Sequence, residues 1–183
     1  MNPRRRWACT ALAALLCGPA LGQGPSFRTI GWDDLLPKDW DPWADFRQGD
    51  LKGIDMTRLS DDDPRAAAAL QRLRKVWDEA PLNMAMDGQS VRVPGYVVPL
   101  DPGAQGLREL LLVPHYGACI HTPPPASNQI IHVRLDKPNK SLSTMDTVWI
   151  SGRLTARRAT TVHGSSGYAL EGVRVERYTA TQR

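Results

Sequence analysis

The chain has 183 residues, of which 42% are hydrophobic and 23% are charged, which is the composition of one globular domain. This composition excludes disordered, collagen-like and multiply membrane-spanning chains. The 15 glycines and 15 prolines favour short strands and turns over a helical bundle, and three cysteines are too few for a disulfide scaffold.

The first 22 residues have the three parts of a secretory signal peptide. Arginines at residues 4–6 precede an apolar run at residues 7–16, and Ala20 and Gly22 place small side chains at the two positions required for cleavage after Gly22. The apolar run is well short of the roughly 20 residues that span a bilayer, so we expect no stable membrane span after cleavage. Cys17 follows Leu16 rather than a small residue, so a lipoprotein is not expected. We predict a periplasmic protein that begins at Gln23.

Cleavage changes both the charge and the cysteine count. The removed segment holds three arginines and no acid, so its loss lowers the formal net charge from +4 to +1. Nucleic-acid binding depends on clustered basic residues, and we therefore expect no nucleic-acid partner. Cys119 becomes the only cysteine, which rules out an internal disulfide.

The mature chain is expected to begin with an irregular arm, followed by one helix. Residues 23–63 are rich in Trp and Asp without a sustained period, and the indoles of Trp32, Trp40 and Trp43 are predicted to anchor the arm on the core. Residues 60–64 combine a polar cap, acids and a proline, which predicts a helix over about residues 63–79. Its apolar stripe, at Ala66, Ala69, Leu70, Leu73 and Trp77, is expected to dock on the core.

From residue 89 onward, short apolar runs alternate with turn residues. The pattern predicts five strands, at residues 90–100, 108–114, 129–135, 147–155 and 167–178. Pro94 and Gly95 inside the first strand are suited to a sharp bend that lets it serve both halves of a barrel. We predict a mainly β fold, a small five-stranded OB-like barrel, with a small β-sandwich as the alternative. The domains are then a signal peptide (1–22), a Trp/Asp-rich arm (23–63) and a helix with a barrel (64–183).

The loop between the second and third predicted strands gathers the residues with metal-binding chemistry. Cys119 and His121 are separated by one residue, so both side chains lie on one face of an extended segment. A thiolate and an imidazole suit Zn²⁺ or copper, with His115 and His132 as weaker candidate donors. Pro123, Pro124 and Pro125 are expected to stiffen the loop.

Other roles for this loop remain open from the residues alone. From the residues alone, Cys119 also fits a buried apolar side chain, and a reactive thiol in a redox protein is a second alternative. A metal-free docking loop is a further alternative, formed by Tyr116, Pro123, Pro124, Pro125, Asn128 and Gln129. The sequence has no phosphate loop, nucleophile elbow or HExxH motif, so no enzymatic activity is predicted.

Several stretches of the chain together resemble one bacterial family of secreted domains of unknown function, the one numbered 3299. They are WDDLLP at residues 32–37, VRVPGYVVPL at 91–100, LLVP at 111–114, GACIH at 117–121, PPP at 123–125 and NQ at 128–129. The resemblance implies a periplasmic accessory protein that serves an ABC-type transport system, in a setting associated with zinc. It therefore favours metal binding by Cys119 and His121. The metal-free alternative drawn from the loop residues docks an envelope or transporter partner instead. His115 stands where the family is expected to have an aromatic residue, which makes it a weaker ligand.

Overall fold

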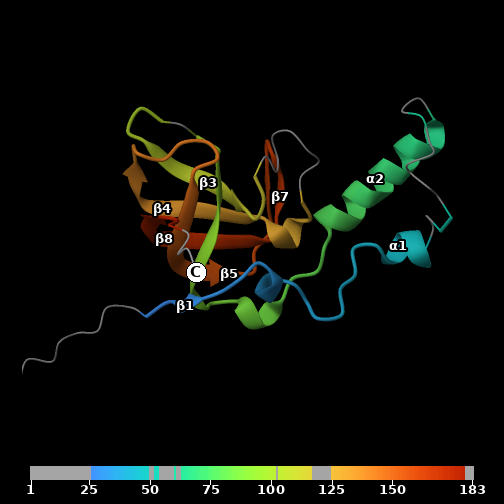
Figure 1. Cartoon of the computed structure of the whole chain (residues 1–183), viewed down its shortest axis with the longest axis horizontal. Coiled ribbons are helices and arrows are strands. Elements are labelled where there is room, and N and C mark those ends of the chain that lie inside the picture. The colour runs from blue at the N-terminus through green and yellow to red at the C-terminus, as the bar shows by residue number, and fades with distance from the viewer. Residues whose placement is uncertain are drawn as a thin grey trace, which may run out of the picture.

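The computed structural model describes residues 26–49, 52, 53, 60, 63–101, 103–116 and 125–179. A β-barrel forms one side of the molecule, and the helices lie beside it (Figure 1). The strands are β1 (Arg28–Thr29), β2 (Ser90–Pro99), β3 (Leu107–Val113), β4 (Ile131–Asn139), β5 (Thr147–Thr155), β6 (Ala159–Thr161), β7 (Gly164–Ser166) and β8 (Tyr168–Arg177). The helices are α1 (Ala44–Arg47) and α2 (Pro64–Asp78), with short 3-10 turns η1 (Asp33–Leu35), η3 (Met84–Met86) and η4 (Ser127–Gln129).

Five strands close into a barrel in the order β2, β3, β4, β8 and β5, because β5 pairs back with β2. The β4–β8 pair is parallel and the other four barrel pairs are antiparallel. This closed five-stranded barrel confirms the predicted OB-like fold, and the sandwich alternative does not apply. The predicted strands match β2, β3, β4, β5 and β8 to within a few residues, whereas β1 and the β6–β7 hairpin were not predicted.

Strand β2 serves both halves of the barrel, as the Pro94–Gly95 pair predicted. It pairs with β5 from Ser90 to Tyr96 and with β3 from Tyr96 to Pro99. Only glycine fits at position 95, because a Cβ there would lie 2.7 Å from Leu112 Cγ and 2.9 Å from the Val113 carbonyl oxygen. The backbone of β3 therefore crosses close to β2 at the point where β2 changes partner.

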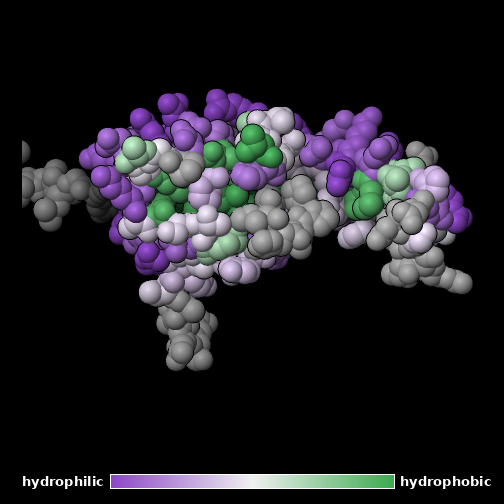
Figure 2. All heavy atoms as spheres, turned by 90° about the horizontal axis from the view of Figure 1, so that it is seen from above, coloured by the Kyte–Doolittle hydropathy of each residue, from purple (hydrophilic) through white to green (hydrophobic). Residues whose placement is uncertain are grey.

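The barrel interior is filled by alternate, inward-facing aliphatic residues of all five strands. Fully buried examples are Val93, Leu110, Val133, Ile150 and Leu170. A second apolar cluster lies on the outer face of β2 and β3, where Val98, Leu111, Val113 and Ile130 are buried. Figure 2 shows hydrophobic side chains gathered over the barrel and bordered by hydrophilic ones.

The arm contacts the barrel through fewer indoles than predicted. Trp32 packs against the core, and Leu35 is fully buried. Trp43, in contrast, is 48% exposed and meets Trp77 of α2 edge-on, with ring centroids 6.2 Å apart. The arm is also less irregular than expected, since it contains β1, η1 and the four-residue helix α1.

Helix α2 begins where the sequence predicted, with Asp63 as its cap. The Asp63 carboxylate accepts a hydrogen bond of 2.8 Å from the Arg65 backbone N–H. Ala66 and Ala69 are buried as expected, but Leu70 is 42% exposed, so the predicted docking stripe is wrong at that position. Among the described residues, no helix is both long and apolar enough to cross a membrane.

Candidate functional site

The loop that carries the predicted metal ligands is described only at its two ends. Cys119, His121, Pro123 and Pro124 lie outside the described residues. At the start of the loop, His115 is exposed, and Tyr116 is 73% exposed. The described ends therefore show what holds the loop to the barrel, and the predicted Cys-x-His pair stays a prediction.

The far end of the loop is fixed by side-chain amides that the sequence placed in a docking loop. Asn128 is fully buried, and its Nδ2 donates to the Pro81 carbonyl oxygen over 3.0 Å. Gln129 Nε2 donates to the Trp32 carbonyl oxygen over 2.9 Å. Gln129 thus attaches η4 to the arm, whereas Asn128, which is buried, attaches it to the segment that follows α2. Of the predicted docking residues that the structure describes, Tyr116 is the one that projects into solvent.

Tyr116 stands beside a pocket lined mainly by aromatic rings and prolines, which we call the aromatic pocket. Its cavity is about 210 Å³ and is lined by Trp32, Pro94, Gly95, Tyr96, Pro114, Thr147 and Tyr178. The indole of Trp32 is held in place because its Nε1 donates to the Pro94 carbonyl oxygen over 2.8 Å. Tyr116 packs edge-on against Tyr96, with ring centroids 5.8 Å apart.

The opposite wall of the aromatic pocket is braced by a stack of side chains. Tyr178 is 40% exposed and stacks on Trp149, with centroids 5.4 Å apart and planes 28° apart. The Arg92 guanidinium carbon lies 4.2 Å from the centroid of the Trp149 ring. The aromatic rings are therefore fixed before any ligand arrives, which reduces the entropy lost on binding.

The sequence did not predict that the residues of the aromatic pocket lie together. Trp32, the Pro94–Tyr96 segment and Pro114 belong to three of the stretches that carry the family resemblance. They lie far apart along the chain, since even the hydrogen-bonded Trp32 and Pro94 are separated by 62 residues. Closure of the barrel and the return of the arm along β2 place them around one cavity. Tyr178, at the end of β8, carried no sequence signal.

A second pocket, the His132 pocket, lies over β3, β4 and β8. Its cavity of about 150 Å³ is lined by Glu109, His132, Arg134, Arg157, Ala169, Leu170 and Glu171. Strands β3 and β4 are the second and third strands of the barrel, and OB-folds commonly bind ligands on the face formed by these two strands. Glu109 lies between His132 and Arg134. Its Oε2 is 3.7 Å from His132 Nε2, and its Oε1 is 3.7 Å from Arg134 Nε.

His132 contributes an unusual feature to this pocket. Its Nε2 is buried and has no hydrogen-bond partner among the described residues, because 3.7 Å to Glu109 exceeds hydrogen-bond length. A buried nitrogen without a partner costs free energy, so such an atom is a candidate ligand contact. Glu109 and Arg157 were not singled out by the sequence, since each lies in a different segment from His132.

The described residues only partly fit the predicted zinc or copper ion. Within them, no three His, Cys, Asp or Glu side chains come together. His132 and Glu109 supply two donors, whereas structural zinc has four ligands. His115 lies at the start of the loop, and His163 lies in the β6–β7 turn. A complete structural zinc site would need two further donors.

Three comparisons with known proteins bear on this chain. A family model described as "Protein of unknown function (DUF3299)" matches residues 32–177. A crystal structure of a protein of that family from Pseudomonas aeruginosa PAO1 is similar, with 28% identity, a TM-score of 0.66, and coverage of 86% of this chain and 100% of that chain. A small single-stranded DNA-binding protein from Streptomyces coelicolor has 17% identity and a TM-score of 0.32, covering 52% of this chain and 99% of that one, too little similarity to support an argument. The comparison with curated proteins found no match.

Proposed function

The chain belongs to the DUF3299 family, and we propose that it is an exported binding module that docks an extended, proline-containing segment of an envelope protein in the aromatic pocket. The observation that carries this proposal is the pocket itself, in which Trp32, Tyr96 and Tyr178 surround one cavity beside the exposed Tyr116. Aromatic-lined grooves bind polyproline II segments because these segments are already extended and lose little entropy.

The lining favours a peptide over a sugar or a nucleic acid. The lining offers few hydrogen-bonding side chains to a ligand: the tyrosine hydroxyls and Thr147. The Trp32 N–H is already bonded to the Pro94 carbonyl oxygen. A sugar has many hydroxyl groups, and each would need a partner when it leaves water. A proline-containing peptide presents apolar rings and few donors, which matches this lining.

We expect an acetylated ten-residue polyproline peptide to bind the mature chain, residues 23–183, and to change its tryptophan fluorescence, because Trp32 lines the cavity. Tyr116→Ala and Tyr178→Ala should each weaken binding about tenfold, which corresponds to about 1.4 kcal/mol for a lost aromatic contact. Tyr116→Phe keeps the ring and should bind like the natural chain. The measurement is a fluorescence titration with each variant.

A matched control is Val162→Ala, which alters a residue that is 87% exposed and does not line the aromatic pocket. Chitohexaose serves as the sugar probe in the same titration. Tighter binding of chitohexaose than of polyproline would contradict the proposal, as would full binding by Tyr116→Ala and Tyr178→Ala.

A second candidate function is transition-metal binding, and the unpartnered Nε2 of His132 beside Glu109 favours it. We expect the mature chain, with Cys119 kept reduced, to bind about one Zn²⁺ in competition with a chromophoric chelator. Cys119→Ser and His121→Gln should weaken zinc binding at least tenfold, and His132→Gln should weaken it less.

His163→Gln is the control for the zinc titration, because His163 lies in the β6–β7 turn, away from both pockets. Equal zinc affinity in the natural chain and in Cys119→Ser would rule out this candidate. A metal-free Cys119 that is alkylated rapidly near neutral pH would instead support the thiol-redox alternative.

A further inference from the structure

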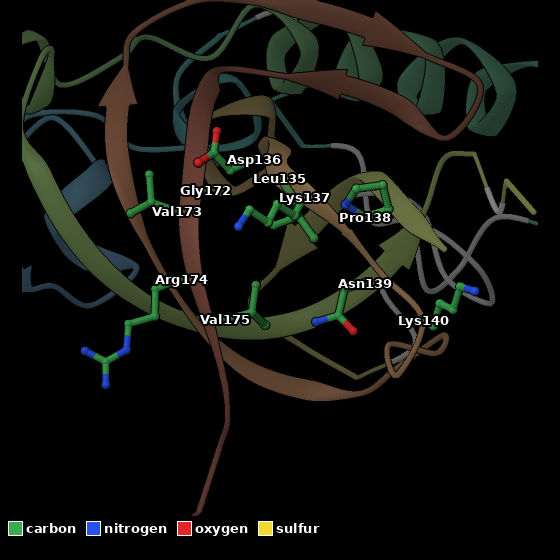
Figure 3. Close-up of a pocket in the computed structure, with 10 residues that line it drawn as sticks. All are labelled: Leu135, Asp136, Lys137, Pro138, Asn139, Lys140, Gly172, Val173, Arg174 and Val175. Atoms are coloured by element: carbon green, nitrogen blue, oxygen red, sulfur yellow. The ribbon is translucent and has the colours of Figure 1, made fainter. Parts of the chain in front are cut away.

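Strands β4 and β8 separate partway along their length and leave a groove between them, which we call the β4–β8 groove. Their parallel pairing runs from the Ile131–Tyr168 pair to the Leu135–Gly172 pair and then ends. Both strands continue, β4 to Asn139 and β8 to Arg177. The space between them is a cavity of about 390 Å³, lined by Leu135, Asp136, Lys137, Pro138, Asn139, Lys140, Gly172, Val173, Arg174 and Val175 (Figure 3).

An irregularity in each strand opens the groove. In β8, Gly172 pairs with Gly152 and Arg174 pairs with Ser151, so Val173 is an extra, bulged residue. In β4, residues 135–138 lie opposite the single residue Arg108 of β3. Because bulges bend the strand that carries them, the two irregularities at the same level turn β4 and β8 apart.

The β8 side of the groove is an unpaired strand edge. Residues 174–177 pair with β5 on one side. In an antiparallel pair, alternate residues direct their N–H and C=O groups away from the partner strand, so those groups of β8 face the groove. Val173 is 54% exposed at this edge. Such an edge is a template for an added strand.

The β4 side of the groove differs, because it carries Lys137 and Pro138. These residue types commonly protect a sheet edge from pairing, and Pro138 has no N–H to offer. Lys137 and Lys140 are both exposed, and neither forms an ion pair with the described residues. In Figure 3, Lys137 extends from β4 toward β8, whereas Arg174 points away and is paired with Glu176 over 3.1 Å.

We propose that the β4–β8 groove binds an extended acidic segment of a partner protein, which adds as a strand to the free edge of β8 while its carboxylates meet Lys137 and Lys140. Backbone hydrogen bonds to β8 supply the pairing, and the two lysines, which outnumber the one lining carboxylate, that of Asp136, select for negative charge. This surface is separate from the aromatic pocket, with which it shares no lining residue. The proposal therefore stands independently of the proposed function.

The test is fluorescence anisotropy with a fluorescein-labelled peptide of four Glu-Val repeats, added to the mature chain at low salt. We expect saturable binding that falls at least tenfold when alternate peptide nitrogens are methylated, because methylation removes the N–H groups that strand pairing needs. The double variant Lys137→Glu with Lys140→Glu should also weaken binding at least tenfold. Its matched control is Lys38→Glu with Lys75→Glu, which changes the charge equally at two other exposed lysines.

Three outcomes would overturn the proposal. Equal binding of the methylated peptide would reduce the interaction to charge attraction without strand addition. Full binding by the Lys137→Glu and Lys140→Glu variant would place the peptide elsewhere. Absence of saturable binding to the natural chain would rule out strand addition in the groove, and self-association of the double variant would then show that the two lysines only protect the edge. All four substitutions are at exposed positions, so circular dichroism is expected to confirm an unchanged fold.

Discussion

Gly152→Ala is expected to lower the free energy of unfolding by about 3 kcal/mol, near the upper end of the usual range for an overpacked core. A Cβ at position 152 would lie 2.1 Å from the Glu171 carbonyl oxygen and 2.8 Å from its carbonyl carbon. Both are backbone atoms of β8, so the clash can be relieved only by moving strands β5 and β8 apart. The measurement is urea unfolding followed by circular dichroism.

Two other glycines give a graded comparison for this variant. At Gly172 a Cβ would meet only side-chain atoms, the closest being Leu135 Cδ2 at 3.0 Å, so Gly172→Ala should cost about 1 kcal/mol. At Gly103 the nearest atom is 3.8 Å away, and Gly103→Ala should be neutral or slightly stabilising because it restricts the unfolded chain. An equal effect at all three positions would mean that backbone contact between β5 and β8 does not determine the cost.

The barrel itself was accessible from the sequence because its strands carry strong local signals. Strand β5 was predicted with its observed bounds, and β2 was predicted with a bend at Pro94–Gly95. The β1 strand was missed because it is two residues long and has no hydrophobic pattern of its own. The β6–β7 hairpin, with three residues in each strand, was missed for the same reason.

The pockets were not accessible from the sequence, because each depends on contacts between distant segments. Trp32 was expected to be an anchor, but it also lines the aromatic pocket, where its hydrogen bond to Pro94 holds the indole. The prediction that Leu70 of α2 is buried was wrong, because helical periodicity does not show how narrow the docked face of a helix is. The small side chains of Ala66 and Ala69 are buried instead. His132 was predicted only as a weaker candidate metal ligand, because its neighbour Glu109 comes from β3 and is brought beside it by the strand register.

Tyr168→Phe is expected to lower the free energy of unfolding by about 3 kcal/mol, because its hydroxyl joins three separate segments of the chain. Tyr168 is fully buried in β8. Its hydroxyl donates to the Leu35 carbonyl oxygen over 2.7 Å and accepts from the Asn83 backbone N–H over 2.7 Å. Removing one oxygen leaves the buried Leu35 carbonyl oxygen without this partner, at a cost of about 1–3 kcal/mol, and also removes the partner of the part-buried Asn83 N–H. Because Leu35 lies in η1, the arm should also become more accessible to hydrogen exchange.

The same hydroxyl predicts a pH dependence that the variant lacks. Burial raises the pKa of Tyr168 above the ordinary value of 10.0, although the hydrogen bond from Asn83 acts in the opposite direction. The folded state therefore holds the proton more tightly than the unfolded state does. This contribution to stability is fully present below about pH 10 and is lost as the pH rises through the higher pKa of the folded state.

The measurement is urea unfolding of the natural chain and of Tyr168→Phe at about pH 8 and about pH 11. Every other titrating group is common to both proteins, so the difference between their free energies of unfolding isolates the contribution of Tyr168. The stability difference between them should shrink at the higher pH. Tyr178→Phe is the control, since Tyr178 is 40% exposed and its substitution should change stability by less than about 0.5 kcal/mol at either pH. If the difference in free energy of unfolding between the natural chain and Tyr168→Phe stays constant with pH, Tyr168 keeps an unshifted pKa. If Tyr168→Phe lowers the free energy of unfolding by less than about 1 kcal/mol, the arm is held by other contacts.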